Sequence, residues 1–293
     1  MKNYHMLTME QKENIKHGES FFPIQKYEAH LPAVCPHITP HWHEESELTR
    51  ITKGACIYQI DLIDYEVKKD DLIFIPPTLL HAVSLGSHKE FHSETYVFHM
   101  NFLGSNATDV CSTKYLTPML NREFQMPCIF TKEHEAYRSL RKCFNQIATL
   151  YENKPFGYEL ALKSELLQIA FLILQYSQKN ALSVSNDASD KLKTVLDFIE
   201  LHYSEALSVS ELAALCYFSE YHFMRFFKKH MNMTCVEYIN NLRLEKSVEL
   251  FEQGNTSILD VSLSVGFKNL SYFHRAFKKK YNMTPLSFIK KLQ

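Results

Sequence analysis

The sequence predicts a multidomain α+β protein, with a β-rich N-terminal part and an all-helical C-terminal part. Short apolar runs separated by Gly, Pro and Asp fill residues 1 to about 110, and from Glu133 onward apolar residues recur at helical spacing instead. Near the C-terminus a twelve-residue pattern occurs twice, fifty positions apart. A length of 293 residues provides for about two domains of ordinary size.

Composition excludes several classes of protein. Hydrophobic residues make up 45% of the chain and charged residues 22%, as in soluble globular proteins. The longest apolar run, residues 169–174, is far shorter than the ~20 residues of a membrane helix, and no apolar signal region follows Met1. Seven cysteines without a Cys-x-x-Cys pair indicate reduced thiols. We therefore expect a cytoplasmic protein with no membrane contact.

Residues 1–130 are predicted to form a β-barrel or sandwich. The strand-like run Glu47–Lys53 leads to Gly54, and another run at residues 72–75 stops at Pro76, because proline cannot donate to a strand ladder. Closely spaced short strands with this punctuation are typical of all-β folds.

Residues 131–180 are predicted to form an antiparallel helix pair joined near residues 155–157. Two apolar stripes at helical spacing indicate this: Leu140, Phe144, Ile147 and Leu150, then Leu160, Leu167, Phe171 and Leu174. Both apolar faces must be buried, and packing on the barrel and pairing with a second subunit are both open at this point. We assign the pair to dimerisation.

The small, polar residues 181–190 are predicted to form a linker, and residues 191–293 a helical domain that contains the repeat. The two copies are Phe223–Thr234 and Phe273–Thr284. They share phenylalanines at i and i+4, an arginine between them, a Lys-Lys pair and an Asn-Met-Thr end. Each copy combines a buried apolar stripe with a basic outer face and a helix stop, which indicates two units with the same role.

The first copy is predicted to lie in a helix-turn-helix unit at about residues 208–230. Ser208 with Glu211 three positions later is a capping-box signature, and Ser219 can cap the second helix. The second helix of such a unit can enter the major groove of DNA. Its outward residues are expected to be Tyr221, His222, Met224, Arg225, Lys228 and Lys229. Asn232 is expected to end this helix in a left-handed conformation.

The second unit is predicted at about residues 257–280, with its turn at Gly266–Asn269. Its outward residues are expected to be Leu270, Ser271, Tyr272, His274, Arg275, Lys278 and Lys279. Val236–Phe251 should form one helix that connects the two units. If the two reading helices lie roughly 34 Å apart, they can enter successive major grooves on one face of a duplex.

The charge distribution favours a polyanionic partner. Net charge is −1, yet the 33 residues after Asp260 contain seven Lys or Arg and no Asp or Glu. Such a segment attracts phosphates. A solvated helix face is the alternative that charge alone leaves open.

Residues from about Asp190 to Lys291 resemble the DNA-binding domain of AraC/XylS-type transcriptional regulators. The motifs that carry the resemblance are Leu212-Ala213, Phe227-Lys228-Lys229, Tyr238-Ile239, Arg243-Leu244, Val265-Gly266-Phe267, Ser271-Tyr272-Phe273, Arg275-Ala276-Phe277-Lys278-Lys279 and Thr284-Pro285. The resemblance implies that the residues approaching bases are Tyr221, Met224, Arg225, Ser271, Tyr272, His274 and Arg275. The two arginines are the strongest candidates, because bidentate Arg to guanine is the commonest specific contact, and the Lys-Lys pairs should contact phosphate.

The chain departs from the family pattern at a few positions. Asn232 and Asn282 stand where the family often has glycine, which an asparagine can replace in a left-handed conformation. Ser247 and Ser262 replace alanines at helix contacts and should cost a little packing.

Four residues of the β-rich part have the types and spacing of metal ligands. His41 and His43, two positions apart on a strand, point the same way, and Glu47 and the distant His81 could complete a metal shell. This is the cupin pattern, and the region resembles the cupin-type sensor domain of the same regulators.

The cupin-like resemblance implies a small-molecule effector. The candidate effector-binding residues are His41, His43, Glu47, Arg50 and His81. Hydrogen-bonded side chains at the barrel mouth are the alternative. Trp42 and Arg50 could stack on or clamp a sugar or an acid. We assign no metal and no cofactor.

Together these observations predict a sequence-specific transcriptional regulator rather than an enzyme, with double-stranded DNA and a small-molecule effector as partners. The resemblance further implies a homodimeric activator that contacts RNA polymerase, with a sugar as one candidate effector. Two alternatives belong to other classes: a metal-dependent cupin enzyme with an accessory DNA-binding domain, and an architectural DNA-binding protein without a ligand.

Overall fold

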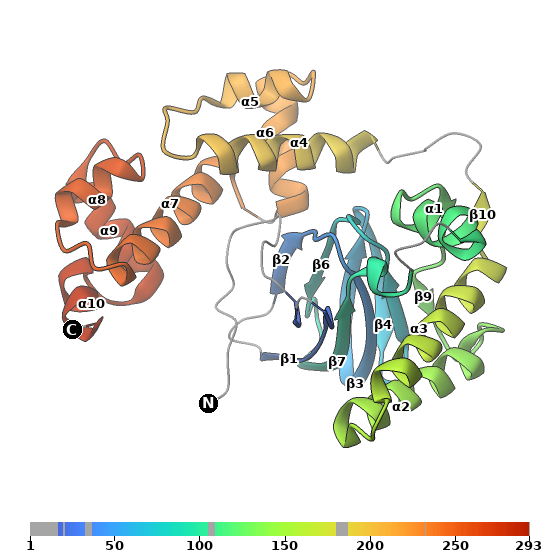
Figure 1. Cartoon of the computed structure of the whole chain (residues 1–293). Helices are drawn as coiled ribbons and strands as arrows, with labels where there is room; N and C mark the ends of the chain where they lie inside the picture. The colour runs from blue at the N-terminus through green and yellow to red at the C-terminus, as the bar shows by residue number, and fades with distance from the viewer. Residues whose placement is uncertain are drawn as a thin grey trace. The chain divides into compact units, whose positions relative to one another are not determined.

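The structure is a computed structural model that describes residues 17–19, 21–32, 37–104, 109–179, 187–231 and 233–292. These residues fall into two compact units, divided in the sequence between residues 186 and 187. The N-terminal unit contains strands β1 to β10 and helices α1 (Thr117–Leu120), α2 and α3, and the C-terminal unit contains helices α4 to α10 (Figure 1). The predicted order, a β-rich part followed by an all-helical part, is therefore confirmed.

The sheet of the N-terminal unit is antiparallel and is organised around one long strand. The strands are β1 (Ile24–Pro32), β2 (His37–His41), β3 (Ser46–Ile60), β4 (Ile63–Lys68), β5 (Leu72–Ile75), β6 (His81–Ser84), β7 (Glu90–Phe98), β8 (Phe124–Gln125), β9 (Ile129–Phe130) and β10 (Gln178–Lys179). The first half of β3 pairs with β5 and β7, and its second half with β4 and β6. Because β3 takes part in both halves, the sheet folds around one interior.

Apolar side chains from several strands fill that interior. They include Ile51 and Tyr58 of β3, Ile73 of β5 and Phe91 of β7, all buried. Gly54 permits the close pairing of β3 with β7: its φ is +75°, and a Cβ there would lie 2.0 Å from the carbonyl oxygen of Glu90. The strand-like run that leads to Gly54 therefore continues through it as one strand, and only glycine fits at this position.

Helices α2 (Tyr137–Asn153) and α3 (Tyr158–Gln175) lie side by side and cover the outer face of this sheet (Figure 1). Their buried residues join strand residues in one apolar cluster that includes Leu48, Tyr96 and Phe144. The helix pair is thus part of the β unit, and the open question of where its apolar face goes is answered by packing on the barrel.

The expected apolar stripe of α3 is wrong in part. The residues that α3 buries are Leu162, Leu166, Ile169, Ala170 and Ile173. Leu160 and Phe171 of the expected stripe are instead 77% and 52% exposed. Apolar residues surround α3 almost completely, so helical spacing alone could not indicate which side faces the sheet.

The C-terminal unit consists of seven helices in the described residues. They are α4 (Asp187–His202), α5 (Val209–Leu215), α6 (Glu220–Met231), α7 (Cys235–Glu252), α8 (Ile258–Ser264), α9 (Leu270–Tyr281) and α10 (Pro285–Leu292). Helices α5 and α6 form the first helix-turn-helix unit and α8 and α9 the second, as predicted. Helix α7 corresponds to the expected connecting helix and packs against both α6 and α9.

The predicted caps are present. Ser208 and Glu211 form a full capping box, and the backbone N–H of His222 donates to the Ser219 hydroxyl. Asn282 adopts the expected left-handed conformation with a φ of 56°. The other predicted helix stop, Asn232, lies outside the described residues.

The expected linker and packing costs differ from the structure in detail. Helix α4 begins at Asp187, inside the segment 181–190 that composition assigned to a linker, and residues 181–186 lie outside the described residues. Ser247 and Ser262 are buried as expected, and each hydroxyl donates to the carbonyl three residues earlier, at 2.7 and 2.8 Å. In the described residues, no helix is long and apolar enough to cross a membrane.

Candidate functional site

Helix α6 presents one buried and one exposed face. Phe223, Phe226 and Phe227 are buried and hold the helix on the unit core. The predicted reading residues of α6 are all exposed: Tyr221, His222, Met224, Arg225, Lys228 and Lys229. The guanidinium of Arg225 lies 5.7 Å from the centre of the Tyr221 ring, one turn earlier, a cation–π contact on the exposed face of the helix.

Helix α9 has the same arrangement. Asn269 caps its first turn by accepting from the backbone N–H of Tyr272 at 2.8 Å, and Phe273 and Phe277 are buried. The exposed predicted residues are Leu270, Ser271, Tyr272, Arg275, Lys278 and Lys279, whereas His274 is half-buried. In the described residues, neither Arg225 nor Arg275 forms an ion pair, so both guanidinium groups are available to an external acceptor.

Two contacts that the sequence did not predict tie α9 to the connecting helix. The amide of Asn240 donates to the Tyr272 hydroxyl at 3.1 Å. The Lys280 ammonium donates to the Glu245 carboxylate at 2.6 Å and to the Asn241 carbonyl at 3.0 Å. Burial lowers the pKa of Lys280, and the adjacent Glu245 opposes that change. These contacts fix the orientation of the exposed face of α9 relative to α7.

Arg243 of α7 stabilises the turn between α8 and α9. Its guanidinium donates to the carbonyls of Tyr203 and Glu205, both at 2.7 Å, and lies 6.0 Å from the centre of the Phe267 ring. Gly266 occupies the adjacent tight space, since a Cβ there would lie 2.7 Å from the Ser204 carbonyl oxygen. Both residues belong to the motifs on which the family resemblance rests, and here their role is architectural.

The N-terminal unit brings four of its five predicted site residues together. Ligand atoms of His41, His43, Glu47 and His81 all lie within 4.8 Å of one another. The residues come from the end of β2, the turn after it, β3 and the start of β6. His43, Glu47 and His81 are buried, and His41 is partly exposed.

The residues of the cluster change the pKa values of one another. Burial lowers the pKa of His41 to about 3, and the nearby His81 and His43 add to this effect. Burial opposes ionisation of Glu47, but His81 and His43 lower the pKa of its carboxyl well below the ordinary value. At neutral pH the cluster therefore holds an uncharged His41 beside an ionised Glu47.

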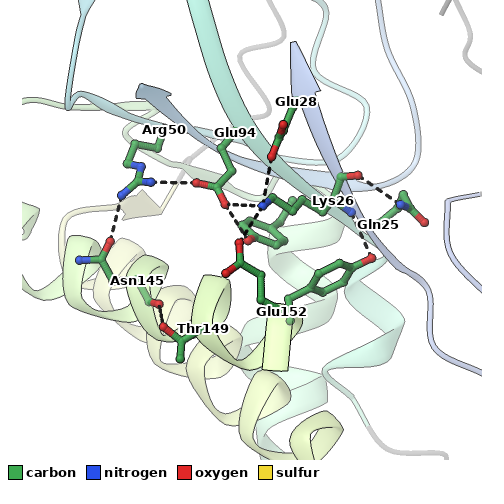
Figure 2. A network of polar contacts seen from close by, with 10 residues as sticks. Gln25, Lys26, Glu28, Arg50, Glu94, Asn145, Thr149 and Glu152 are labelled. Carbon is green, nitrogen blue, oxygen red and sulfur yellow. Dashed lines mark hydrogen bonds and ion pairs between the residues drawn. The ribbon is translucent and has the colours of Figure 1, made fainter. Parts of the chain in front are cut away.

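Arg50, the fifth predicted residue, lies on the opposite face of β3, and its expected role in the barrel site is not supported. Its guanidinium donates to the Glu94 carboxylate at 2.9 Å and to the Asn145 side chain of α2 at 3.0 Å. Figure 2 shows that Glu94 also contacts Lys26, which reaches Glu152 of α2. Arg50 is three positions after Glu47 on β3, and strand side chains an odd number of positions apart point to opposite faces.

Two hollows in the N-terminal unit lie away from the cluster. One, of about 400 Å³, is lined by residues that include Tyr65, Cys128 and Tyr176. The other, of about 650 Å³, runs along α2 beside Arg138 and Arg141. Neither is lined by the four cluster residues, and Trp42, a candidate stacking platform, is only 6% exposed. The cluster is therefore a compact polar site and the hollows are separate surfaces.

A barrel with a buried polar cluster, followed by two basic helix-turn-helix units, defines a class of regulators that combine ligand binding with DNA binding. Residues 31–170 match the family model of an AraC-like ligand binding domain, and residues 205–291 match that of a helix-turn-helix domain. The chain belongs to the AraC family of DNA-binding transcriptional regulators.

Relatives agree with this assignment. An uncharacterised HTH-type transcriptional regulator, YdeC of Bacillus subtilis, is 26% identical over 99% of both chains. The bifunctional transcriptional activator/DNA repair enzyme AdaA of B. subtilis is 36% identical over 34% of this chain and 47% of its own. A solved structure of ToxT from Vibrio cholerae aligns with 91% of this chain and 98% of its own, at 15% identity and a TM-score of 0.40, a similarity too weak to support any conclusion.

Proposed function

We propose that this regulator recognises a specific DNA sequence through the exposed faces of α6 and α9, with Arg225 and Arg275 as the main base-reading residues. The single observation that supports the proposal is the matched pair of solvent-exposed faces, each with an unpaired arginine at the same position, on two helices packed against α7. An 18-residue α7 is roughly 27 Å long at 1.5 Å per residue. This is the same order as the roughly 34 Å between successive major grooves on one face of a duplex.

The lysines of the two units have a different role in this proposal. Lys228, Lys229, Lys278 and Lys279 are exposed and lie in the last turns of α6 and α9. Lysine is a compact charge on a flexible stem, suited to phosphate oxygens rather than to base edges. These residues should supply affinity that depends on salt but not on sequence.

Binding-site selection from random duplexes, followed by fluorescence anisotropy, tests both roles with the full chain. We expect discrimination on the order of 10³ or more between selected and random DNA. Arg275→Ala should cost roughly 1–3 kcal/mol and relax the preference at one base pair. As the matched control, Lys278→Ala should weaken binding to every duplex and reduce the salt slope by about one.

Two results would contradict this proposal. If Arg275→Ala weakens all duplexes equally, Arg275 contacts phosphate and the base-reading assignment is wrong. If the wild-type protein binds all duplexes nearly equally, the chain is an architectural DNA-binding protein.

The N-terminal unit is proposed to bind a small-molecule effector that shifts the equilibrium between two arrangements of the protein on DNA. The protein is proposed to act in the cytoplasm. An effector can do so only by binding one arrangement more tightly. Activation through RNA polymerase, and a sugar as the effector, follow from the family resemblance. A thermal-shift screen of sugars and small acids tests the effector, and a hit should depend on His41 or His43.

The outer face of α3 supports a homodimer. Leu160 and Phe171 are 77% and 52% exposed on that face, and Phe156 before the helix is also exposed. Large apolar side chains exposed on one face of a helix indicate an interaction site, and a second copy would bury the same residues on both subunits. Phe171→Glu should convert dimer to monomer in analytical ultracentrifugation. Ile63→Glu, at a residue of β4 that is 53% exposed, is the control and should leave the dimer intact.

A further inference from the structure

We propose that the hollow of about 400 Å³ beside β4, β8 and β9 binds an uncharged planar heterocycle with an amide-like hydrogen-bonding edge, of the nicotinamide or adenine type. The hollow shares no lining residue with the histidine cluster, for which an effector is proposed above. The inference therefore concerns a second ligand of the N-terminal unit, and it does not depend on how the C-terminal unit reads DNA.

The walls of the hollow come from segments that are far apart in the sequence. Tyr65 belongs to β4, Gln125 to β8 and Ile129 to β9, while Tyr176 and Gln178 follow α3. The other lining residues connect β8 to β9: Met126, Pro127 and Cys128. The volume of about 400 Å³ lies within the usual range of small-molecule sites, roughly 300–1,000 Å³.

The chemistry of the lining selects an uncharged ligand. Among the described residues, the lining contains no Asp, Glu, Lys, Arg or His. Burial raises the pKa of the Cys128 thiol to about 12 and also raises the pKa of the Tyr65 phenol, so both groups keep their protons at neutral pH. Because the lining offers no opposite charge, a phosphate, carboxylate or ammonium group would lose part of its hydration here without gaining an ion pair.

Two tyrosine rings give the hollow aromatic walls. Tyr65 is 37% exposed and Tyr176 is 39% exposed. The His134 ring contacts the Tyr176 ring edge-on at 4.9 Å between centroids, and the Tyr176 hydroxyl donates to Glu135 at 3.3 Å. Neither His134 nor Glu135 lines the hollow, so these contacts hold the Tyr176 ring in place without filling the site. A held, partly exposed ring is a surface on which a planar heterocycle can stack.

Two glutamines supply the hydrogen-bonding groups. Gln125 and Gln178 are directly opposite each other in the antiparallel β8–β10 pair, so their side chains leave the same face. Neither side-chain amide forms a hydrogen bond within the described part of the chain. Each amide offers an acceptor oxygen and an NH₂ donor, which is the pattern that pairs with the primary amide of nicotinamide or with the N6/N7 edge of adenine. A planar ligand of this class uses the rings and the amides at once.

A ligand in this hollow would also hold the last part of the N-terminal unit on the sheet. Tyr176 and Gln178 lie shortly before the boundary between the units, at residues 186 and 187, and β10 is only two residues long. A pair this short opens readily and exchanges its backbone hydrogens. Contacts of one ligand with β4, with β8 and with residues 176–178 add to the pairing, so ligand binding should slow that exchange.

Titration of the full chain with nicotinamide tests the site, and nicotinate, the same ring with a carboxylate, is the matched control. We expect nicotinamide to bind with a Kd of about 1 mM or lower, which is consistent with its small size. Nicotinate should bind at least about 10-fold more weakly. The ¹³C-methyl signal of Met126, assigned from Met126→Leu, should shift with nicotinamide, and backbone hydrogen exchange of residues 176–178 should slow.

Two variants remove one recognition element each. Tyr65→Leu removes a wall ring and Gln178→Leu removes an amide, so each should weaken nicotinamide binding at least about fivefold. Both residues are exposed, so the melting temperature should stay close to that of the wild type. The matched controls are Tyr115→Leu, at a tyrosine that is 47% exposed, and Gln146→Leu, at an exposed glutamine of α2. Neither residue lines this hollow, and both variants should bind nicotinamide as the wild type does.

Three results would overturn the inference: no shift of the Met126 signal up to about 10 mM nicotinamide, equal binding of nicotinate, or wild-type affinity in both Tyr65→Leu and Gln178→Leu. Binding of glucose but not of nicotinamide would assign the hollow to a sugar and would also overturn it. DNA discrimination, measured on the same variants without added ligand, should equal that of the wild type. A failure of DNA reading therefore counts against the proposed function alone.

Discussion

The two helix-turn-helix units end their first helices with the same hydrogen bond but with different residues. Phe218 N–H donates to the Ala213 carbonyl in the first unit, and Phe267 N–H donates to the Ser262 carbonyl in the second. The left-handed position before each phenylalanine is Tyr217 in the first unit, at a φ of 57°, and Gly266 in the second, at 96°.

The surroundings explain the difference. Tyr217 is 92% exposed, so a large side chain in an unfavourable backbone conformation has room. Gly266 packs directly against the Ser204 carbonyl, where a Cβ would lie at 2.7 Å. A helix stop thus tolerates a non-glycine residue at a modest cost when it faces solvent, and requires glycine when another segment covers it.

The largest expected effect is that of Gly266→Ala. A Cβ at this position meets backbone atoms that cannot move aside and also occupies a left-handed conformation, so the variant should lose about 3 kcal/mol of unfolding free energy. Tyr217→Ala, at the open turn, should change it by less than about 0.5 kcal/mol. Hydrogen exchange of residues 187–292 in the full chain measures both. Equal losses would show that space around Gly266 is not the controlling factor.

Removal of the α9–α7 ion pair should come next. Lys280→Met keeps the length of the side chain but removes both hydrogen bonds to α7, and we expect a loss of about 2 kcal/mol. Lys278→Met, at an exposed position of the same helix, is the control and should be nearly neutral. A thermal melt followed by circular dichroism at 222 nm compares them. If both variants melt alike, the Lys280 contacts do not anchor α9.

The N-caps offer a third contrast. Ser208 belongs to a reciprocal capping box with Glu211, whereas Ser257 only accepts from the backbone N–H of Asp260. Ser208→Ala should cost about 1 kcal/mol and Ser257→Ala about half of that. Hydrogen exchange at the first turns of α5 and α8 measures the two losses locally. A larger loss at Ser257 would contradict this ranking.

Replacement of the strained tyrosine should have a smaller effect, of opposite sign. Tyr217→Gly removes the cost of a side chain in the left-handed region but adds backbone freedom to the unfolded chain, for a net gain of about 0.5 kcal/mol. Denaturant unfolding of the full chain, followed by circular dichroism, measures it. A destabilised variant would mean that the tyrosine ring makes a favourable contact that outweighs the strain.

The smallest expected effect is a pH dependence at the first cap. Hydrogen bonds from the Ser208 side chain and backbone lower the pKa of Glu211. Because the folded-state pKa is depressed, this contribution to stability is present above the ordinary glutamate pKa and is lost as the pH falls through the folded value. The difference between wild type and Glu211→Gln should therefore shrink between pH 7 and about pH 3. A pH-independent difference would show that the charge of Glu211 is irrelevant.

Most of the helical unit could be predicted because its signals are local. Caps at Ser208 and Ser219, the phenylalanine stripes and the turn at Gly266 each depend on residues within one helical turn. The offset between the two units is not constant. Leu212 and Val261 are equivalent and 49 positions apart, whereas Phe223 and Phe273 are equivalent and 50 positions apart, because the second turn is one residue longer.

The parts that could not be predicted depend on residues far apart in the sequence. The contact of Gly266 with Ser204, and that of Lys280 with Glu245, arise only when the chain is folded. The prediction that Leu160 and Phe171 belong to the buried stripe of α3 failed for another reason. Apolar residues lie around nearly the whole helix, so helical spacing does not identify the side that faces the sheet. The position of Arg50 was available from strand alternation, because an odd separation from Glu47 excludes a shared face.

Helix α7 limits how the DNA specificity of this protein could evolve. Tyr238, in its first half, packs on Phe227 of the first unit, while Phe251, near its end, packs on Phe277 of the second. One continuous helix thus contributes side chains to the hydrophobic cores of both helix-turn-helix units. Neither half can be excised or transplanted without opening the interior of the other, so new DNA specificity must come from exchanging surface side chains rather than whole modules.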